Sequence, residues 1–186
     1  MNSIMLWYKK FDYNMKDDLK VMCNEYTEQF DHEPFWTYKS VANSKMWTIP
    51  PLGEKRKRLF DVVDYAVLQN IRGLKKSITE TTGLKLEDES PVDCIWRFDE
   101  KFTHCPIHTD AGGEHTGSVV AKISGNFKLH LHEEDKENSK IVETIDIEGL
   151  IALNNTVYPH SVEGQGDLLV FGADKDMVPE EYFANV

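Results

Sequence analysis

The spacing of hydrophobic side chains divides the chain into two parts. In the first part they recur every three or four positions, which is typical of amphipathic helices. This spacing predicts a helix over 15–30, preceded by Asn14 as a capping residue, and a second helix over 55–81 that Gly83 would end. The apolar faces of these two helices consist of Leu19, Met22, Cys23, Tyr26 and Phe30, and of Leu59, Val62, Val63, Ala66, Val67 and Leu74.

The second part, from Pro91 onward, has short hydrophobic runs separated by glycines and polar clusters, which is the pattern of β-strands. The polar stretch 133–140 is interpreted as a hairpin loop, and Gly125, Gly149 and Gly164 as turns. The predicted strands cover roughly 92–98, 117–124, 127–133, 140–146, 150–153 and 167–172.

Helices followed by a run of strands predict an α+β fold in which the helices cover one face of a β-sandwich or barrel. The length of 186 residues suits one domain. We therefore expect a single domain over 1–186, with mainly helical support in 1–90 and a β-rich core in 91–175.

Composition narrows the classes of function. The net charge of -11 argues against a general nucleic-acid binder, which needs a basic face for phosphates. Cys23, Cys94 and Cys105 show no CxxC spacing, so neither a zinc ribbon nor a disulfide framework is predicted, and a reducing cytoplasm fits the chain. Neither a secretion signal nor a membrane-spanning run is visible, so no membrane partner is expected.

Two histidines and an aspartate carry the candidate chemistry. In His108-Thr109-Asp110, residues i and i+2 would point to the same face of a strand and could bind one metal ion. His160, far downstream and just before the final predicted strand, could supply a third ligand. Two histidines and one carboxylate on one face of an octahedron leave three positions open, which is the arrangement of non-haem Fe(II) oxygenases.

With these residues in place, the segment 92–172 resembles the 2-oxoglutarate/Fe(II)-dependent oxygenase superfamily. The stretch 159–162 (Pro-His-Ser-Val) resembles the distal-histidine motif of its prolyl-hydroxylase-like members. The stretch 126–131 (Asn-Phe-Lys-Leu-His-Leu) is similar to the Arg-Leu-Arg-x-His-Leu strand of aspartyl/asparaginyl hydroxylases. The resemblance implies a double-stranded β-helix (jelly-roll) core with supporting N-terminal helices. It also implies a catalytic metal held by His108, Asp110 and His160.

The chain departs from the family at one position. These families usually carry an arginine on the last strand that holds the far carboxylate of 2-oxoglutarate, whereas 168–170 here is Leu-Leu-Val. A buried unpaired carboxylate is costly, so another cation is required. Lys128 is the first candidate, with His130 beside it, because both match the basic residue and histidine of the Arg-x-His strand. Arg97 and Lys122 are the reserves.

By the same resemblance, Fe(II) and 2-oxoglutarate would be the cofactors and O2 the oxidant, and the reaction would hydroxylate a substrate C–H bond. The prolyl-hydroxylase-like features suggest a small molecule, an amino acid or a protein side chain as substrate. Asn155 and Tyr158 would line the pocket near His160.

Two other interpretations stay open. His130 and His132, with Gly125 before them and Glu137 after them, approximate the first metal-binding motif of cupins. Cupins share the barrel and bind metal without a 2-oxo acid. The other alternative is a non-catalytic barrel that has lost the cosubstrate site, because the arginine of the last strand is missing. Alanine at Asp110 should abolish iron binding in an oxygenase and leave it intact in a cupin.

Overall fold

A computed structural model describes most of the β-rich half of the chain and parts of the N-terminal half. For 45–48 and 65–71 it describes the backbone alone. The described residues are 8–17, 20–21, 23–24, 45–48, 65–86, 93–110, 117–156 and 158–172.

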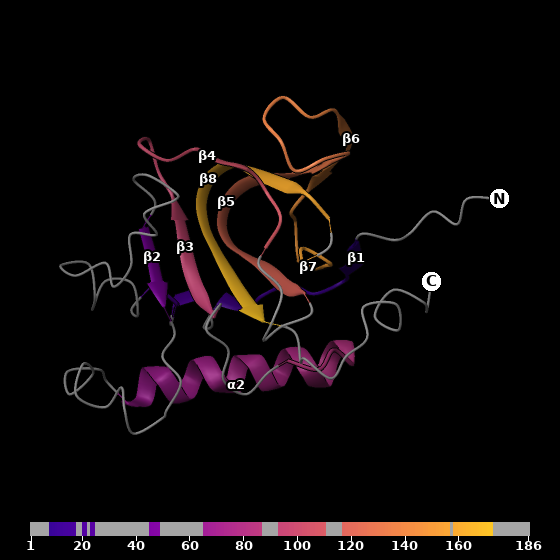
Figure 1. The fold of residues 1–186 in the computed structure, drawn as a ribbon. Coiled ribbons are helices and arrows are strands. Elements are labelled where there is room, and N and C mark those ends of the chain that lie inside the picture. The colour runs from indigo at the N-terminus through magenta and orange to yellow at the C-terminus, as the bar shows by residue number, and fades with distance from the viewer. Residues whose placement is uncertain are drawn as a thin grey trace, which may run out of the picture.

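The architecture is a mostly antiparallel β-sheet with helix α2 (Tyr65–Thr82) packed against it (Figure 1). The strand order is β1-β7-β5-β8-β3-β2, with β4 added to β8 and β6 added to β5. All described strand pairs are antiparallel. The strands are β1 (Tyr8–Phe11), β2 (Lys45–Thr48), β3 (Cys94–Phe98), β4 (His104–His108), β5 (Ser118–His132), β6 (Ile141–Asp146), β7 (Leu150–Leu153) and β8 (His160–Gly172).

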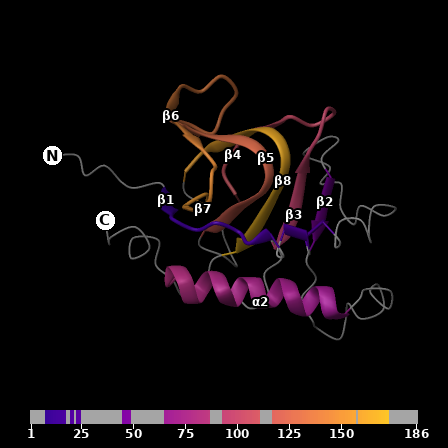
Figure 2. The same ribbon diagram turned by 180° about the vertical axis from the view of Figure 1, so that it is seen from behind.

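The long strands β5 and β8 curve through the whole molecule and belong to two layers (Figures 1 and 2). In the helix-side layer, the first part of β5 and the last part of β8 lie beside β7, β1, β3 and β2. In the far layer, the last part of β5 and the first part of β8 lie beside β6 and β4. This arrangement is that of a β-sandwich or jelly roll.

Glycine makes the bend of the two long strands feasible. Gly125 on β5 lies opposite Gly166 on β8, and both have positive φ angles, of 79° and 129°. A Cβ atom on Gly125 would lie 1.8 Å from the carbonyl oxygen of Gln165. The sequence pattern predicted a turn at Gly125 between two strands. The chain instead continues as one strand, with a register shift between Lys122 and Ser124 that increases its bend.

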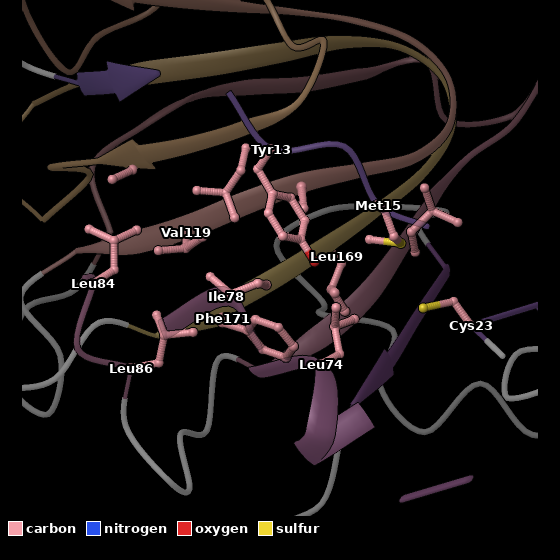
Figure 3. Close-up of a cluster of buried hydrophobic side chains, with 14 of the residues drawn as sticks. Tyr13, Met15, Cys23, Leu74, Ile78, Leu84, Leu86, Val119, Leu169 and Phe171 are labelled. Atoms are coloured by element: carbon pink, nitrogen blue, oxygen red, sulfur yellow. The ribbon is translucent and has the colours of Figure 1, made fainter. Parts of the chain in front are cut away.

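Two hydrophobic clusters fill the space on either side of the helix-side layer. The interior cluster lies between the two layers and draws side chains from both. Its buried members are Phe98, Phe102, Cys105, Phe127, Leu129, Leu131, Ile145, Ile147, Ile151, Leu153, Val162 and Leu168. The second cluster lies between the helix-side layer and helix α2 (Tyr65–Thr82) (Figure 3). In it, Leu74 and Ile78 of the helix pack near Val119, Leu169 and Phe171 of the strands.

A buried ion pair ties the helix to the sheet. The ammonium group of Lys75 on α2 bonds Oδ2 of Asp93, and both residues are at least nine-tenths buried. Oδ1 of Asp93 accepts a hydrogen bond of 3.0 Å from the amide of Gly172, at the end of β8. The Lys75 ammonium also lies 5.1 Å from the ring centroid of Phe171. These contacts fix α2 against the C-terminal end of β8.

The predicted β core is largely confirmed, and the helical half only in part. Helix α2 covers the second part of the predicted helix 55–81 and ends one residue later, and Gly83, with a φ angle of 74°, follows it as expected. Of the first predicted helix, 15–30, the described residues between 17 and 24 have helical backbone, and 25–30 lie outside the described residues, as do 55–64. The strands β1 and β4 and the first half of β8 were not predicted. Within the described residues, no helix is long and apolar enough to cross a membrane.

Candidate metal centre

His108, Asp110 and His160 come together as the sequence predicted. One ligand atom from each residue lies within 4.8 Å of the others. The Nε2 atom of His108 is 3.0 Å from Oδ1 of Asp110, and Nε2 of His160 is 3.8 Å from the same oxygen. A search of the described residues for three or more histidine, cysteine or acidic side chains close enough to hold a metal ion finds this group.

Strand pairing explains why these distant residues meet. His108 ends β4, His160 begins β8, and the two are paired directly across the strands. Residues that face each other in an antiparallel pair point to the same side of the sheet. His160 is also paired with Leu131, a member of the interior cluster. Both imidazoles therefore point to the interior side of the far layer, where their ring centroids are 4.3 Å apart.

Backbone carbonyls fix the orientation of both imidazoles. The Nδ1 atom of His108 lies 2.8 Å from the carbonyl oxygen of Pro106, and Nδ1 of His160 lies 3.1 Å from that of Tyr158. An Nδ1–H donated to a carbonyl leaves the Nε2 lone pair free for a metal, and histidine ligands in metalloproteins are commonly held in this way. The donor set and its outer contacts therefore fit a divalent metal ion.

Asn155 holds the carboxylate of Asp110. Its Nδ2 group donates to Oδ2 of Asp110 at 2.6 Å and to Oγ of Ser118 at 2.8 Å. The amide of Asp110 also donates to the Asn155 carbonyl at 2.9 Å. With Oδ2 engaged, Oδ1 is the oxygen that faces the two histidines. Because Asn155 follows β7, this contact connects the helix-side layer to the loop after β4.

The two histidines differ in charge while the metal is absent. Burial lowers the pKa of His108, but the hydrogen bond to Asp110, the contact with Cys105 and the Pro106 carbonyl outweigh it and raise the pKa to about 11. Burial and the neighbouring His108 lower the pKa of His160 to about 4. Near neutral pH, His108 is therefore protonated and His160 is neutral. A metal ion would displace the proton from His108, so its binding should release protons.

Lys128 and His130 do not join the three candidate ligands. Both alternate along β5 with members of the interior cluster, so they point to the outer side of the far layer. The Lys128 side chain is exposed. Nδ1 of His130 is 2.8 Å from Oγ1 of Thr144, and its Nε2 is 3.3 Å from Oε1 of Glu163. Lys128 and His130 therefore lie on the side of the sheet opposite the three candidate ligands.

Arg97 forms an ion pair away from the three candidate ligands. Its guanidinium donates to both carboxylate oxygens of Asp167, at 2.8 and 2.9 Å. Arg97 alternates on β3 with Trp96 and Phe98, which pack in the interior cluster, so it too points away from the interior. Asp167 lies seven positions along β8 from His160, roughly 20 Å along the strand. The expected role of Arg97 in cosubstrate binding does not agree with this position.

Lys122, the other reserve, has a different orientation. It alternates on β5 with Ala121 and Ile123, which pack against the helix side. Its side chain therefore points into the space between the layers, opposite Leu168 of the interior cluster, and it is half-buried. Of the four basic or imidazole side chains considered for the cosubstrate, Lys122 has the orientation that this role needs.

The cupin-like pair has other partners. Nε2 of His132 lies 2.8 Å from Oγ of Ser161, and its Nδ1 lies 3.3 Å from the Ser139 carbonyl. The rings of His130 and His132 are 6.4 Å apart. Since both imidazoles already bond protein oxygens on the outer side of the far layer, their arrangement does not resemble a metal site.

The sequence analysis missed several residues around the centre. Ser118 and the bond between Asn155 and Asp110 depend on pairing between β7 and β5, for which no local pattern exists. Tyr8 on β1 and Glu143 on β6 also lie at this end of the sandwich, joined by a hydrogen bond of 2.7 Å. Acidic residues in an exposed hairpin are too common to have singled out Glu143.

Comparison with protein-family models and with curated proteins gives no match for this chain. Comparison with solved structures finds a similar fold in the crystal structure of a prolyl-4-hydroxylase from Pseudomonas putida. The TM-score is 0.53 and the sequence identity 14%, over 92% of this chain and 94% of that chain. At this identity the likeness concerns the fold alone, and this chain places a His-Asp-His group within that fold.

Proposed function

We propose that this protein is an Fe(II)- and 2-oxoglutarate-dependent dioxygenase that hydroxylates a small molecule, an amino acid or a protein side chain. The convergence of two imidazole nitrogens and one carboxylate oxygen inside a prolyl-hydroxylase-like fold supports this function. In this proposal the two layers form a double-stranded β-helix within a single cytoplasmic domain. His108, Asp110 and His160 hold the iron.

The protein's own residues would position and shield the metal. Bound Fe(II) would supply a Lewis-acidic, redox-active centre for the 2-oxo acid and O2. The Pro106 and Tyr158 carbonyls keep both Nε2 atoms directed at it. Asn155 keeps one Asp110 oxygen occupied, which favours monodentate binding and leaves positions open for a bidentate cosubstrate. The interior cluster excludes water from the inner side of the site.

Lys122 is our candidate for holding the far carboxylate of 2-oxoglutarate. It points into the interior and lies four positions along β5 from Ser118, roughly 13 Å along the strand. An extended lysine side chain and a five-carbon diacid together cover a distance of this order. A lysine supplies a point charge where the usual arginine gives two parallel hydrogen bonds, so we expect weaker cosubstrate binding than with arginine.

The deciding experiment is an anaerobic titration with Fe(II) followed by 2-oxoglutarate, monitored by the weak visible charge-transfer band of the chelate. We expect the band in the wild-type protein and its loss in His108→Ala and Asp110→Ala. His130→Ala is the matched control, because this histidine lies on the outer side of the same layer, and it should keep the band. Lys122→Met should raise the 2-oxoglutarate Kd about tenfold or more, whereas Lys128→Met should leave it unchanged.

Two outcomes would favour the alternatives. Iron binding that survives in Asp110→Ala would overturn the His108–Asp110–His160 assignment and favour a cupin-type site. Iron binding without a band on addition of 2-oxoglutarate would mean that the missing arginine reflects a lost cosubstrate site. The protein would then be a metal-binding barrel without oxygenase activity.

A further inference from the structure

The end of the sandwich that contains the candidate metal ligands also contains a carboxylate–phenol pair. The hydroxyl of Tyr8 on β1 donates to Oε1 of Glu143 on β6 at 2.7 Å. Tyr8 belongs to the helix-side layer and Glu143 to the far layer. The hydrogen bond therefore joins the two layers.

Strand register places Glu143 in the same row as the metal ligands. His160 is paired with Leu131, and Leu131 is paired with Glu143. Glu143 lies two positions before Ile145 on β6, and Ile145 is a member of the interior cluster. Residues two apart on a strand point to the same side, so Glu143 also points to the interior side. Two strand spacings separate the backbones of His160 and Glu143, roughly 10 Å.

A second contact between the layers lies at the same end of the sandwich. In the helix-side layer, Tyr8 is paired with Leu153, and Leu153 with Ser118. Ser118 connects through Asn155 to Asp110 and so to the metal group. The metal group and the Tyr8–Glu143 pair therefore lie at the same end of the sandwich.

The pair presents a negative charge to solvent. Glu143 is exposed, and Tyr8 is partly buried beside the interior cluster. The hydrogen bond to Glu143, burial and the charge of Glu143 raise the pKa of Tyr8 to about 12, so the phenol stays protonated and remains a donor. In the described part of the chain no lysine or arginine pairs with Glu143.

The adjacent hairpin loop does not neutralise this charge. Its two lysines, Lys136 and Lys140, pair with Glu134 and Glu133. The remaining acidic residues of the loop, Asp135 and Glu137, add to the negative charge beside Glu143.

We propose that Glu143, oriented by Tyr8, is a specificity residue that binds an ammonium or guanidinium group of the substrate. The proposal rests on the oxygenase function proposed above and names its substrate class as a compound with a lysine- or arginine-like side chain. The cationic group would bind at Glu143 while the C–H bond to be oxidised lies near the metal, roughly 10 Å away across Leu131. A hydrogen-bonded carboxylate of fixed orientation distinguishes such a cation from a neutral side chain of equal length.

The test uses capped tripeptides, Gly-X-Gly, in which X is lysine, arginine, norleucine or glutamate. Their binding to the full-length protein is measured by calorimetry, on the metal-free protein and on the Zn(II)-loaded protein with 2-oxoglutarate, so that turnover is not needed. We expect the lysine or arginine peptide to bind about tenfold more tightly than the norleucine peptide. Glu143→Gln should remove this preference, and Tyr8→Phe should reduce it.

Glu163→Gln is the matched control, because Glu163 is also exposed but lies on the outer side of the far layer. It should keep the preference. Equal binding of the lysine, arginine and norleucine peptides, no binding of any peptide, or a preference that persists in Glu143→Gln overturns the proposal. The 2-oxoglutarate band is recorded on the same variants. A normal band without cation preference refutes the role of Glu143 alone, whereas a missing band refutes the oxygenase function.

Discussion

Replacing Asn155 by leucine tests whether its hydrogen bond positions Asp110. The Nδ2 group of Asn155 bonds Asp110 at 2.6 Å and Ser118 at 2.8 Å, and Asn155 is only 4% exposed. Leucine has the same branched shape and number of heavy atoms, so the substitution removes the donor while keeping the outline of the side chain. Asp110 would keep its backbone bond to residue 155 but would lose the donor that engages Oδ2. Its carboxylate could then rotate away from the two histidines.

Loss of such an outer contact typically weakens metal binding by about 10- to 100-fold, or about 1.4–2.8 kcal/mol. The metal-free protein should also lose about 1.5–3 kcal/mol of stability, because a hydrogen bond to a charged group is removed. Co(II) titration against a competing chelator measures the first effect. Urea unfolding of the metal-free protein measures the second.

Asn154→Leu is the matched control. Asn154 is the adjacent residue and 7% exposed, and its Oδ1 atom is buried without a hydrogen-bond partner. Its replacement should leave the Co(II) Kd within about threefold of the wild-type value. A wild-type Kd in Asn155→Leu, or equal weakening in both variants, would refute the positioning role and leave Asn155 as an ordinary packing residue.

Three further predictions concern the framework and the two histidines. Asp93→Leu should cost about 3–5 kcal/mol in urea unfolding, because it removes the carboxylate that pairs with the buried Lys75 charge; the double variant with Lys75→Met should recover most of this loss, and no recovery would contradict the explanation. Gly125→Ala should cost more than about 2 kcal/mol, because of its φ angle of 79° and the backbone that its Cβ would meet; an unchanged urea midpoint would show that β5 can bend in another way. Because the pKa of His160 is lowered to about 4 from 6.5, the unfolded chain takes up its proton first, and the metal-free protein should lose stability as pH falls from 6.5 toward 4. The raised pKa of His108 adds to the stability of the folded protein in full below pH 6.5, and this contribution is lost as pH rises toward 11. Urea midpoints that show no maximum near pH 6.5 would argue against both pKa shifts.

The candidate ligands were predictable because their signal is local. His108 and Asp110 are two positions apart, and a short motif surrounds His160. The order of helices and strands was also readable from periodicity, as α2 and the strands β3, β6 and β7 show. Local spacing contains enough information when one element, or one turn, fixes the relation between side chains.

Strand β4 and the first half of β8 were not predicted, because their sequences lack alternation. β4 contains Pro106 and two histidines, and the start of β8 reads His-Ser-Val-Glu-Gly-Gln-Gly. These strands are stabilised by pairing with each other and with β5 rather than by a hydrophobic face of their own. The curvature at Gly125 was hidden for a similar reason, because glycine indicates a turn until its partner Gly166 is known.

The side of the sheet to which a residue points separates the predicted site residues that lie in the interior from those that lie outside it. The register shift between Lys122 and Ser124 inserts one residue into β5. Before the shift, even-numbered residues such as Lys122 point into the interior, and after it odd-numbered residues such as Leu131 do. Lys128 lies after the shift, so an even spacing from Lys122 no longer means the same side. A motif match along the sequence cannot detect this change. Because of it, Lys128, the anchor proposed from the sequence, points outward, whereas Lys122 points into the interior.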